Sequence, residues 1–350
     1  MKNLLYVPIL QSKRGEYSAL FELSSQIKDH IKPMIVLTQQ DCEARATGLA
    51  KTLDDKWKNL PSYIDLTNVT PFQINNVDYV DAIVSSLLVT SNPFSLVIDV
   101  NNPYQKIIDN VIQHSLPACL KVEVAQFDNN TISKIQNLIN ILQSTAQEID
   151  IFINFSVDIK STRTAHAHYI DQYYTNLKNN LTNYNGKYII GGSSIPKDLP
   201  RTDYQPYGLE PRIEWLGFDD FIGSSGLVDP LDKPIFADYS ITYPFESEPI
   251  TYVNPNAKVR YTISDNYLFA VGYQVLTHAD GFGQYHDISA IIVNSPYFMG
   301  GNYSWGDKYL EDCASRTTGC GNMETWVRVG HNHHITFVTR DIASRYGISL

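Results

Sequence analysis

The first two-thirds of the chain alternates short apolar runs with helical patterns, and this alternation constrains the fold more than any other feature. The apolar runs begin roughly thirty residues apart, the combined length of one β-strand and one α-helix. Most runs are continuously apolar, as expected for strands of a parallel sheet that is covered on both faces. The predicted strands are 4–10, 33–37, 63–66, 95–100, 119–124, 149–155 and 188–192, and the eighth is either 213–218 or 234–239.

Eight such units would close a barrel, so we predict an α/β protein with a (β/α)8 TIM-barrel-like fold. A doubly wound open sheet is the alternative, but no G-x-G-x-x-G pattern follows the first strand. From about residue 200 the repeat is lost, and Pro, Gly, Tyr and Asp become frequent. We therefore predict a barrel with long late loops over residues 1–257. Residues 258–350 are predicted to form an irregular C-terminal extension, with helices at 265–273, 288–293 and 307–314.

The composition predicts a folded cytoplasmic protein. Apolar residues make up 43% and charged residues 18%, which favours a sizeable core over disorder. The apolar runs are too short to cross a bilayer, and the start of the chain resembles a first strand, not a signal peptide. We therefore expect no membrane partner. The net charge of −10 argues against a broad nucleic-acid-binding surface.

Functional residues of a (β/α)8 barrel lie where its strands end. Lys13 and Glu16 follow the first predicted strand, and Asp99 and Glu123 lie on the fourth and fifth. We predict that these four residues converge at the C-terminal mouth and are catalytic if the protein is an enzyme. Two carboxylates could act as acid and base on a glycosidic or phosphate ester bond, or hold a divalent cation. Alternatively, Asp99 and Asn102 form a helix cap.

Two further strand ends supply binding candidates. Ser193 and Ser194 follow two glycines after an apolar strand, and small residues there let backbone N–H groups approach a phosphate or carboxylate. This interpretation requires a helix directly after Pro196; otherwise the segment is a tight turn that uses glycine flexibility. Asp238 lies on one candidate for the eighth strand.

The last fifty residues are dense in Trp, Arg and His. Trp and Arg are typical of partner anchors, and clustered His favours metal or proton chemistry. The spacing of Cys313 and Cys320 from these histidines matches no usual zinc motif, so we predict no metal site, and any cofactor stays unknown. We predict that Arg328 pairs with Asp307. Alternatively, the Trp residues pack under a loop and the histidines cap a strand. The binding candidates, expected to lie close together, are Trp305, Asp307, Trp326, Arg328, His331, His333 and His334.

Four segments resemble, in the right order, the Beta proteins of phages and mobile elements. They are residues 6–20 (YVPILQSKRGEYSAL), 191–196 (GGSSIP), 236–239 (FADY) and the tail from SWGD at 304 to the histidine pair at 333. The resemblance implies an accessory protein of a phage, mobile-element or anti-phage defence locus. It would bind a partner protein encoded nearby, a toxin or effector, as an antitoxin or immunity protein does.

The acidic charge and the Tyr- and Trp-rich second half are compatible with covering a basic partner. The alternative is a TIM-barrel hydrolase or phosphodiesterase with a carboxylate-lined site at the mouth of the barrel. The fold alone does not decide between the two.

Overall fold

The computed structural model describes residues 3–45, 48–156, 159, 162–200, 202, 207–227, 229, 232–244 and 254–350. Its contacts divide the chain into two compact units. The first comprises Met1–Ser12, Asp29–Ser193 and Ile213–Tyr239, and the second comprises Lys13–Lys28, Ser194–Arg212 and Ser240–Leu350. In this division the C-terminal part also includes Lys13–Lys28, Ser194–Arg212 and the residues from Ser240 to the predicted boundary at 257.

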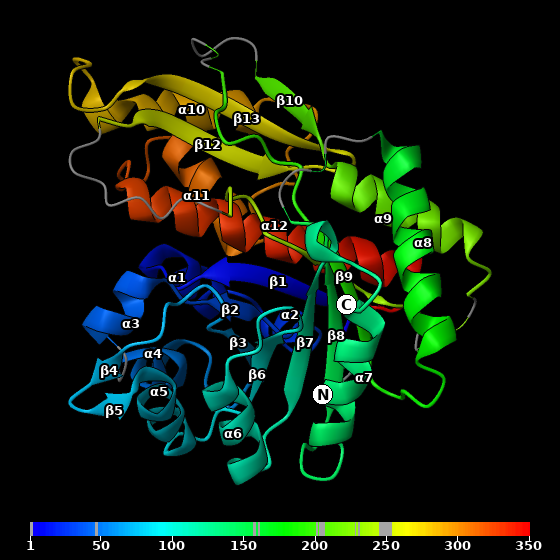
Figure 1. Cartoon of the computed structure of the whole chain (residues 1–350). Coiled ribbons are helices and arrows are strands. Elements are labelled where there is room, and N and C mark those ends of the chain that lie inside the picture. The colour runs from blue at the N-terminus through cyan, green and yellow to red at the C-terminus, as the bar shows by residue number, and fades with distance from the viewer. Residues whose placement is uncertain are drawn as a thin grey trace. The chain divides into compact units, whose positions relative to one another are not determined.

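The first unit is a closed barrel of parallel strands in the order β1-β11-β9-β8-β7-β6-β3-β2 (Figure 1). Closure is visible at β1, which pairs with β11 on one side and with β2 on the other. The predicted (β/α)8 architecture is therefore confirmed. The eighth strand is the later of the two candidates. The strands are β1 (Tyr6–Gln11), β2 (Met34–Val36), β3 (Ser62–Asp65), β6 (Phe94–Asp99), β7 (Ala118–Glu123), β8 (Ile149–Asn154), β9 (Tyr188–Gly192) and β11 (Ile235–Asp238).

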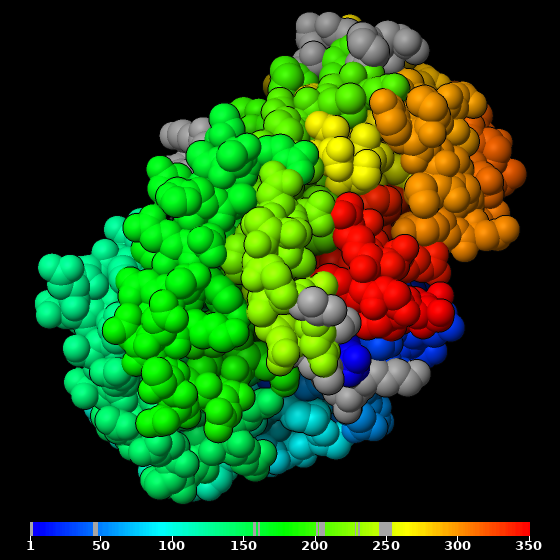
Figure 2. Space-filling model, turned by 90° about the vertical axis from the view of Figure 1, so that its right-hand side faces the viewer, coloured from blue at the N-terminus to red at the C-terminus, as the bar shows by residue number. Residues whose placement is uncertain are grey.

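Helices cover the outside of the barrel strands (Figure 1). Residues 213–218, the earlier candidate for the eighth strand, instead begin helix α9, which packs beside α8 (Figure 2). The hairpin of β4 (Gln73–Ile74) and β5 (Val77–Asp78) precedes α5, and Asp78 caps this helix by accepting from the Val80 N–H at 2.9 Å. The helices are α3 (Gln39–Arg45), α4 (Gly48–Lys56), α5 (Tyr79–Leu88), α6 (Gln105–His114), α7 (Thr131–Leu142), α8 (Arg163–Asn180) and α9 (Ile213–Ser224).

The barrel interior is filled by inward-facing apolar side chains from every barrel strand. Because side chains alternate along a strand, residues two apart on each strand point to the same side. The barrel is therefore a packed core and not an open channel, and the polar residues at the strand ends lie around the end of this core. The buried members of this core are Val7, Ile9, Met34, Tyr63, Val97, Cys119, Phe152, Ile189, Ile235 and Ala237.

The second unit contains a three-stranded antiparallel sheet in the order β10-β13-β12. Its helices include the two predicted at 288–293 and 307–314. The helix predicted at 265–273 is wrong, because this segment is strand β13 and pairs with β12. The extension thus contains more regular structure than its sequence indicated. The elements are α1 (Arg14–Phe21), α2 (Ser25–Lys28), β10 (Gly208–Pro211), β12 (Asn256–Thr262), β13 (Asn266–Gln274), α10 (Gln284–Val293), α11 (Trp305–Ala314) and α12 (Met323–Arg345).

Helix α12 is the longest element of the second unit and the centre of its packing. It begins with a capping box, in which Asn322 and Thr325 satisfy each other's backbone N–H groups. One side contacts α1, where the Asn332 amide donates to the Ala19 carbonyl at 3.1 Å. Another side contacts α11, where the Gly306 N–H donates to the Asn332 side chain at 2.9 Å. No helix in the described ranges is long and apolar enough to span a membrane.

Candidate functional site

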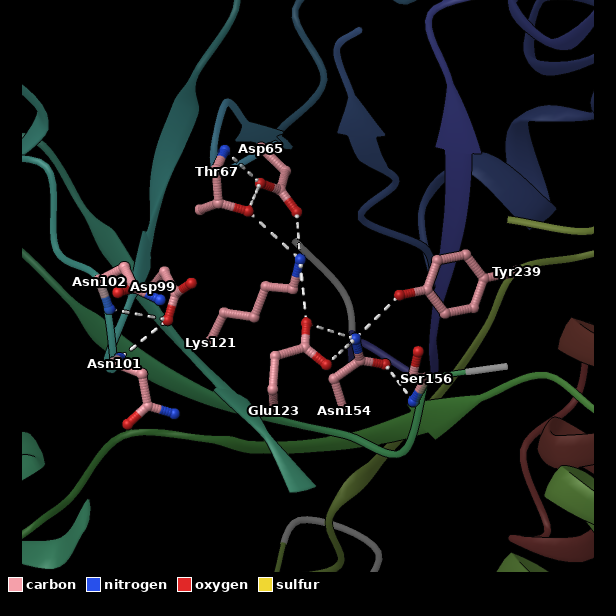
Figure 3. A network of polar contacts seen from close by, with 10 residues as sticks. All are labelled: Asp65, Thr67, Asp99, Asn101, Asn102, Lys121, Glu123, Asn154, Ser156 and Tyr239. Atoms are coloured by element: carbon pink, nitrogen blue, oxygen red, sulfur yellow. Dashed lines mark hydrogen bonds and ion pairs between the residues drawn. The ribbon is translucent and has the colours of Figure 1, made fainter. Parts of the chain in front are cut away.

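A polar network lies at the carboxyl ends of the barrel strands, where barrel proteins carry their sites (Figure 3). Lys121 and Glu123 are two residues apart on β7, so both side chains point to the same side of the sheet. Asp65 ends β3, and Asn154 lies opposite Glu123 in the β7–β8 register. Tyr239 follows β11. We call these five residues the Lys121 network.

The ammonium group of Lys121 is the centre of the network. Its Nζ atom lies 3.2 Å from Asp65 Oδ2 and 3.2 Å from Glu123 Oε1. The side-chain amide of Asn154 lies 2.9 Å from both oxygens of Glu123 and 2.9 Å from the Tyr239 hydroxyl. Figure 3 shows these side chains pointing toward one another from different strands. The cation therefore links two carboxylates, and the amide fixes one of them.

Burial and charge set the protonation of the Lys121 network. Burial lowers the pKa of Lys121, but the attraction of Asp65 and Glu123 outweighs it, so the pKa is raised and the side chain is a cation. Burial raises the pKa of Tyr239 to about 12, which keeps the phenol neutral. A protonated lysine does not serve as a nucleophile, and the charge of Lys121 is already compensated by the two carboxylates. The Glu123 side chain is 19% exposed against 1% for Asp65, so Glu123 is the carboxylate that solute can reach.

The structure brings one of the four predicted catalytic residues, Glu123, into this network. Asp99 accepts from the backbone N–H groups of Asn101 and Asn102 at 2.8 and 3.3 Å, which forms a turn in the loop after β6. The alternative helix cap is wrong, because α6 begins only at Gln105 and its N-cap is Tyr104. Lys13 and Glu16 belong to the second unit. There Glu16 is buried, and its Oε2 atom lies 3.8 Å from Nε2 of His331. The convergence of all four at one mouth stays a prediction.

The glycine-rich segment serves strand packing. Gly191 and Gly192 lie within β9, and a Cβ atom on Gly191 would collide with Ala237 of the neighbouring strand. The described residues 197–200 form no helix, so the condition for an anion loop at Ser193 and Ser194 is not met. The Ser193 N–H donates to the Ser156 carbonyl at 2.8 Å, and the Ser194 hydroxyl donates to the Pro211 carbonyl at 3.0 Å.

Asp238 is fully buried at the end of β11 and lies outside the Lys121 network. Its Oδ1 atom accepts from the Tyr6 hydroxyl at 2.5 Å, across the β1–β11 pair that closes the barrel. Among the residues that the structure describes, no three His, Cys, Asp or Glu side chains are grouped as ligands for a metal ion.

The histidines of the tail lie on α12 in the interior of the second unit. Asp307 accepts from the Tyr261 and Ser304 hydroxyls, both at 2.6 Å, and lies 2.9 Å from Nδ1 of His333. The His334 ring lies 2.7 Å from the Thr262 hydroxyl. None of Asp307, His331, His333 and His334 is more than 1% exposed, so these predicted binding residues stabilise the unit and do not form its surface.

The aromatic part of the tail forms a second cluster in the same unit. Trp326 stacks on Tyr285 with 4.3 Å between ring centroids. The Arg328 guanidinium lies over the Trp305 ring at 4.0 Å. The expected pair between Arg328 and Asp307 is wrong: Arg328 pairs with Glu22 of the loop after α1, and Asp307 pairs with His333. Sequence spacing could not distinguish these partners, because Glu22 comes from the other end of the chain.

Comparison with known proteins identifies a family and a structural match of low similarity. A family model described as Beta protein matches residues 6–340. No curated protein matches the sequence significantly. A solved structure of alanine racemase from Clostridium difficile 630, in complex with cycloserine, matches with 11% identity and a TM-score of 0.35. The match covers 75% of this chain and 58% of the racemase chain.

Proposed function

Because this chain belongs to the Beta protein family, we propose that it is an accessory protein of a phage, mobile-element or anti-phage defence locus, which acts by binding a partner protein. The partner would be a toxin or effector encoded nearby, and binding would mask it as an antitoxin or immunity protein does. The buried histidines of the tail are not placed to form a binding surface. A group of apolar side chains on and beside strand β10, three of them exposed, supports the proposal best.

This group, which we call the β10 patch, consists of Tyr207, Leu209, Tyr297 and Met299. The rings of Tyr207 and Tyr297 meet edge to face with centroids 5.9 Å apart. Tyr207 directly precedes β10, and Leu209 is the second residue of this strand. Leu209, Tyr297 and Met299 are 41%, 37% and 46% exposed. Grouped apolar side chains at a surface are typical of protein interaction sites, with tyrosine and methionine enriched there.

The charge of the chain indicates what kind of partner the patch would meet. The net charge of −10 favours association with a basic protein, because complementary charge accelerates encounter and suppresses acidic competitors. The β10 patch would then supply the apolar contacts that slow dissociation. A protein with a negative net charge and an apolar contact patch is suited to masking a basic effector.

The test is direct binding between this protein and the purified product of each neighbouring gene, measured by titration calorimetry. Leu209→Asp and Met299→Asp should each weaken binding by about tenfold or more, since a charge would replace an apolar contact. Leu276→Asp is the matched control, because Leu276 is 54% exposed in the same unit but follows the end of β13, whereas β10 pairs with the beginning of that strand. Equal losses in all three variants, or no binding by any neighbour, would contradict the proposal.

A second candidate function is hydrolysis of a phosphodiester or glycosidic bond at the Lys121 network. The observation that favours it is the partly exposed Glu123 beside a buried cation at the carboxyl ends of the strands. Lys121 and Asn154 would hold Glu123 in place, and Glu123 would act as base. Chromogenic phosphodiester and glycoside substrates test this function. Glu123→Gln should lower kcat at least about a hundredfold at unchanged melting temperature; equal activity of variant and wild type would reject it.

A further inference from the structure

A cavity of about 550 Å³ opens at the amino-terminal end of the barrel, the opposite end from the Lys121 network. It lies where three neighbouring strands begin. Leu5 precedes β1, Pro234 precedes β11, and Tyr188 begins β9. Its side wall comes from Tyr174 and Lys178 in the last two turns of α8. The volume falls within the range of roughly 300–1,000 Å³ that is typical of small-molecule sites.

Three tyrosines give the cavity an aromatic wall. The Tyr188 ring meets Tyr174 and Tyr184 edge to face, with centroids 5.3 and 5.1 Å apart. The Tyr184 hydroxyl lies 3.0 Å from the Ile149 carbonyl oxygen and 2.9 Å from that of Lys187, which fixes the ring. Rigid aromatic side chains of this kind are suited to contact with a planar ring.

Lysines give the same cavity a positive charge. Among the described residues that line it, three are lysines, Lys178, Lys187 and Lys233, and one is a carboxylate, Asp232. Within the described structure, the Lys178 ammonium contacts the neutral Tyr174 side chain, 3.3 Å from its hydroxyl and 5.4 Å from its ring centroid. A cation whose contact is neutral remains available to an incoming anion.

Lys187 is charged as well. Its ammonium lies 2.9 Å from Glu148. Burial lowers the pKa of Lys187, but the hydrogen bond and charge of Glu148 outweigh this effect, so the pKa is raised. Glu148 compensates the charge of Lys187, so Lys178 is the ammonium group that is better placed to meet an anion, with Lys187 beside it.

From the aromatic wall and the adjacent ammonium groups, we propose that this cavity binds a small organic phosphate that carries a planar ring, the chemistry of a nucleoside monophosphate. The ring would lie against Tyr184 and Tyr188, and the phosphate would lie near Lys178 and Lys187. This site is separate from the Lys121 network and the β10 patch, and it does not depend on the proposed function. In barrel enzymes the catalytic residues lie at the carboxyl-terminal end, and the residues at the amino-terminal end stabilise the fold. The proposed ligand site would lie at this amino-terminal end.

Titration calorimetry with AMP as the probe tests the proposal on the full chain, with adenosine and inorganic phosphate as the two partial ligands. AMP should bind at least about tenfold more tightly than either part, because it alone engages both the tyrosines and the lysines. Adenosine that binds as tightly as AMP would overturn the phosphate assignment. Phosphate that binds as tightly as AMP would overturn the ring assignment, and no detectable binding of AMP would overturn the site.

Substitution locates the site. Lys178→Ala should weaken AMP binding about tenfold and leave adenosine binding unchanged, since the lost contact is to the phosphate. The side chain is exposed, so the fold should tolerate the change. Lys134→Ala is the matched control, because Lys134 contacts Asn101 at the carboxyl end of the same barrel. AMP affinity that is unaffected by Lys178→Ala, or reduced equally by Lys134→Ala, would place the ligand elsewhere.

Discussion

The Nδ1 atom of His333 lies 2.9 Å from Oδ2 of Asp307, and neither side chain is exposed to solvent. The second ring nitrogen, Nε2, lies 2.8 Å from the Thr262 carbonyl oxygen. Only a ring with a proton on both nitrogens donates to both oxygens. The pair therefore joins α11, α12 and β12 through opposite charges that compensate each other where an unpaired charge would be strongly destabilising.

Asp307→Asn should lower the free energy of unfolding by about 3–5 kcal/mol near neutral pH, because it leaves His333 without its counter-charge. Burial raises the pKa of Asp307, but His333, Ser304 and Tyr261 outweigh burial, so the pKa is lowered. The stability from this carboxylate is thus present above its unfolded pKa of about 3.9 and lost as pH falls through the folded value. Urea unfolding should show the gap between wild type and variant closing below about pH 4; a constant gap would contradict the pairing.

His331 predicts a separate pH dependence. Burial lowers the pKa of His331 to about 3, and its ring nitrogens lie 2.8 Å from the Val327 carbonyl oxygen and 2.9 Å from the Thr242 hydroxyl, as suits a neutral ring. The unfolded chain takes up this proton near pH 6.5, whereas the folded chain does so near pH 3. The contribution of the neutral His331 ring to the free energy of unfolding is therefore fully present above about pH 6.5 and is lost as pH falls toward 3.

His331→Gln should remove this loss, making the fall in unfolding free energy shallower by up to about 1.4 kcal/mol per pH unit between about pH 6 and 4. His168→Gln is the control, because its side chain is exposed on α8. Urea titrations across this range provide the measurement. Identical slopes for wild type and His331→Gln would show that the ring is not held neutral.

The Lys121 network predicts strong coupling between two buried charges. Lys121→Met should reduce the free energy of unfolding by about 3–5 kcal/mol, because Asp65 is 1% exposed and would lose its cation. Adding Asp65→Asn should recover a large part of this loss, since no unpaired buried carboxylate then remains. A double-mutant cycle by urea unfolding gives the coupling directly. Additive effects of the two changes would refute the ion pair.

Close packing of α11 on α12 depends on Gly306. A Cβ atom there would collide with the Val329 backbone oxygen, which cannot move aside without shifting the helix. Gly306→Ala should therefore destabilise the protein by about 1–3 kcal/mol, despite the higher helix propensity of alanine. Gly319→Ala serves as control, because nothing lies within 4 Å of its added Cβ. Thermal melts compare the two, and equal melting temperatures would contradict the packing argument.

The barrel could be predicted because its strands are continuously apolar and regularly spaced, a pattern that depends on local sequence. Strand β13 could not be predicted, because a short apolar run such as Asn266–Gln274 fits a buried helix equally well. Helix α12 has no apolar face to detect, since its histidines and Asn332 are buried beside its apolar residues.

The candidate site was predictable in part. Glu123 was found because it ends a strand, and the same signal applies to Asp65, Lys121 and Asn154. Which of these side chains meet depends on the register and order of the strands, which sequence spacing does not contain. Tyr239 was missed in favour of Asp238 beside it, because alternation along β11 decides which of the two joins the network.

The pairing of α1 with α12 makes the order of synthesis relevant to folding. Ala19 and Asn332, which hydrogen-bond across this pair, are 313 residues apart in the chain. During translation α1 must therefore wait, with its apolar face uncovered, until α12 has left the ribosome. Such a distant contact adds loop-closure entropy to the folding barrier. The second unit thus becomes complete only after the barrel sequence has been made, and a prematurely terminated chain would expose α1 to chaperones and proteases.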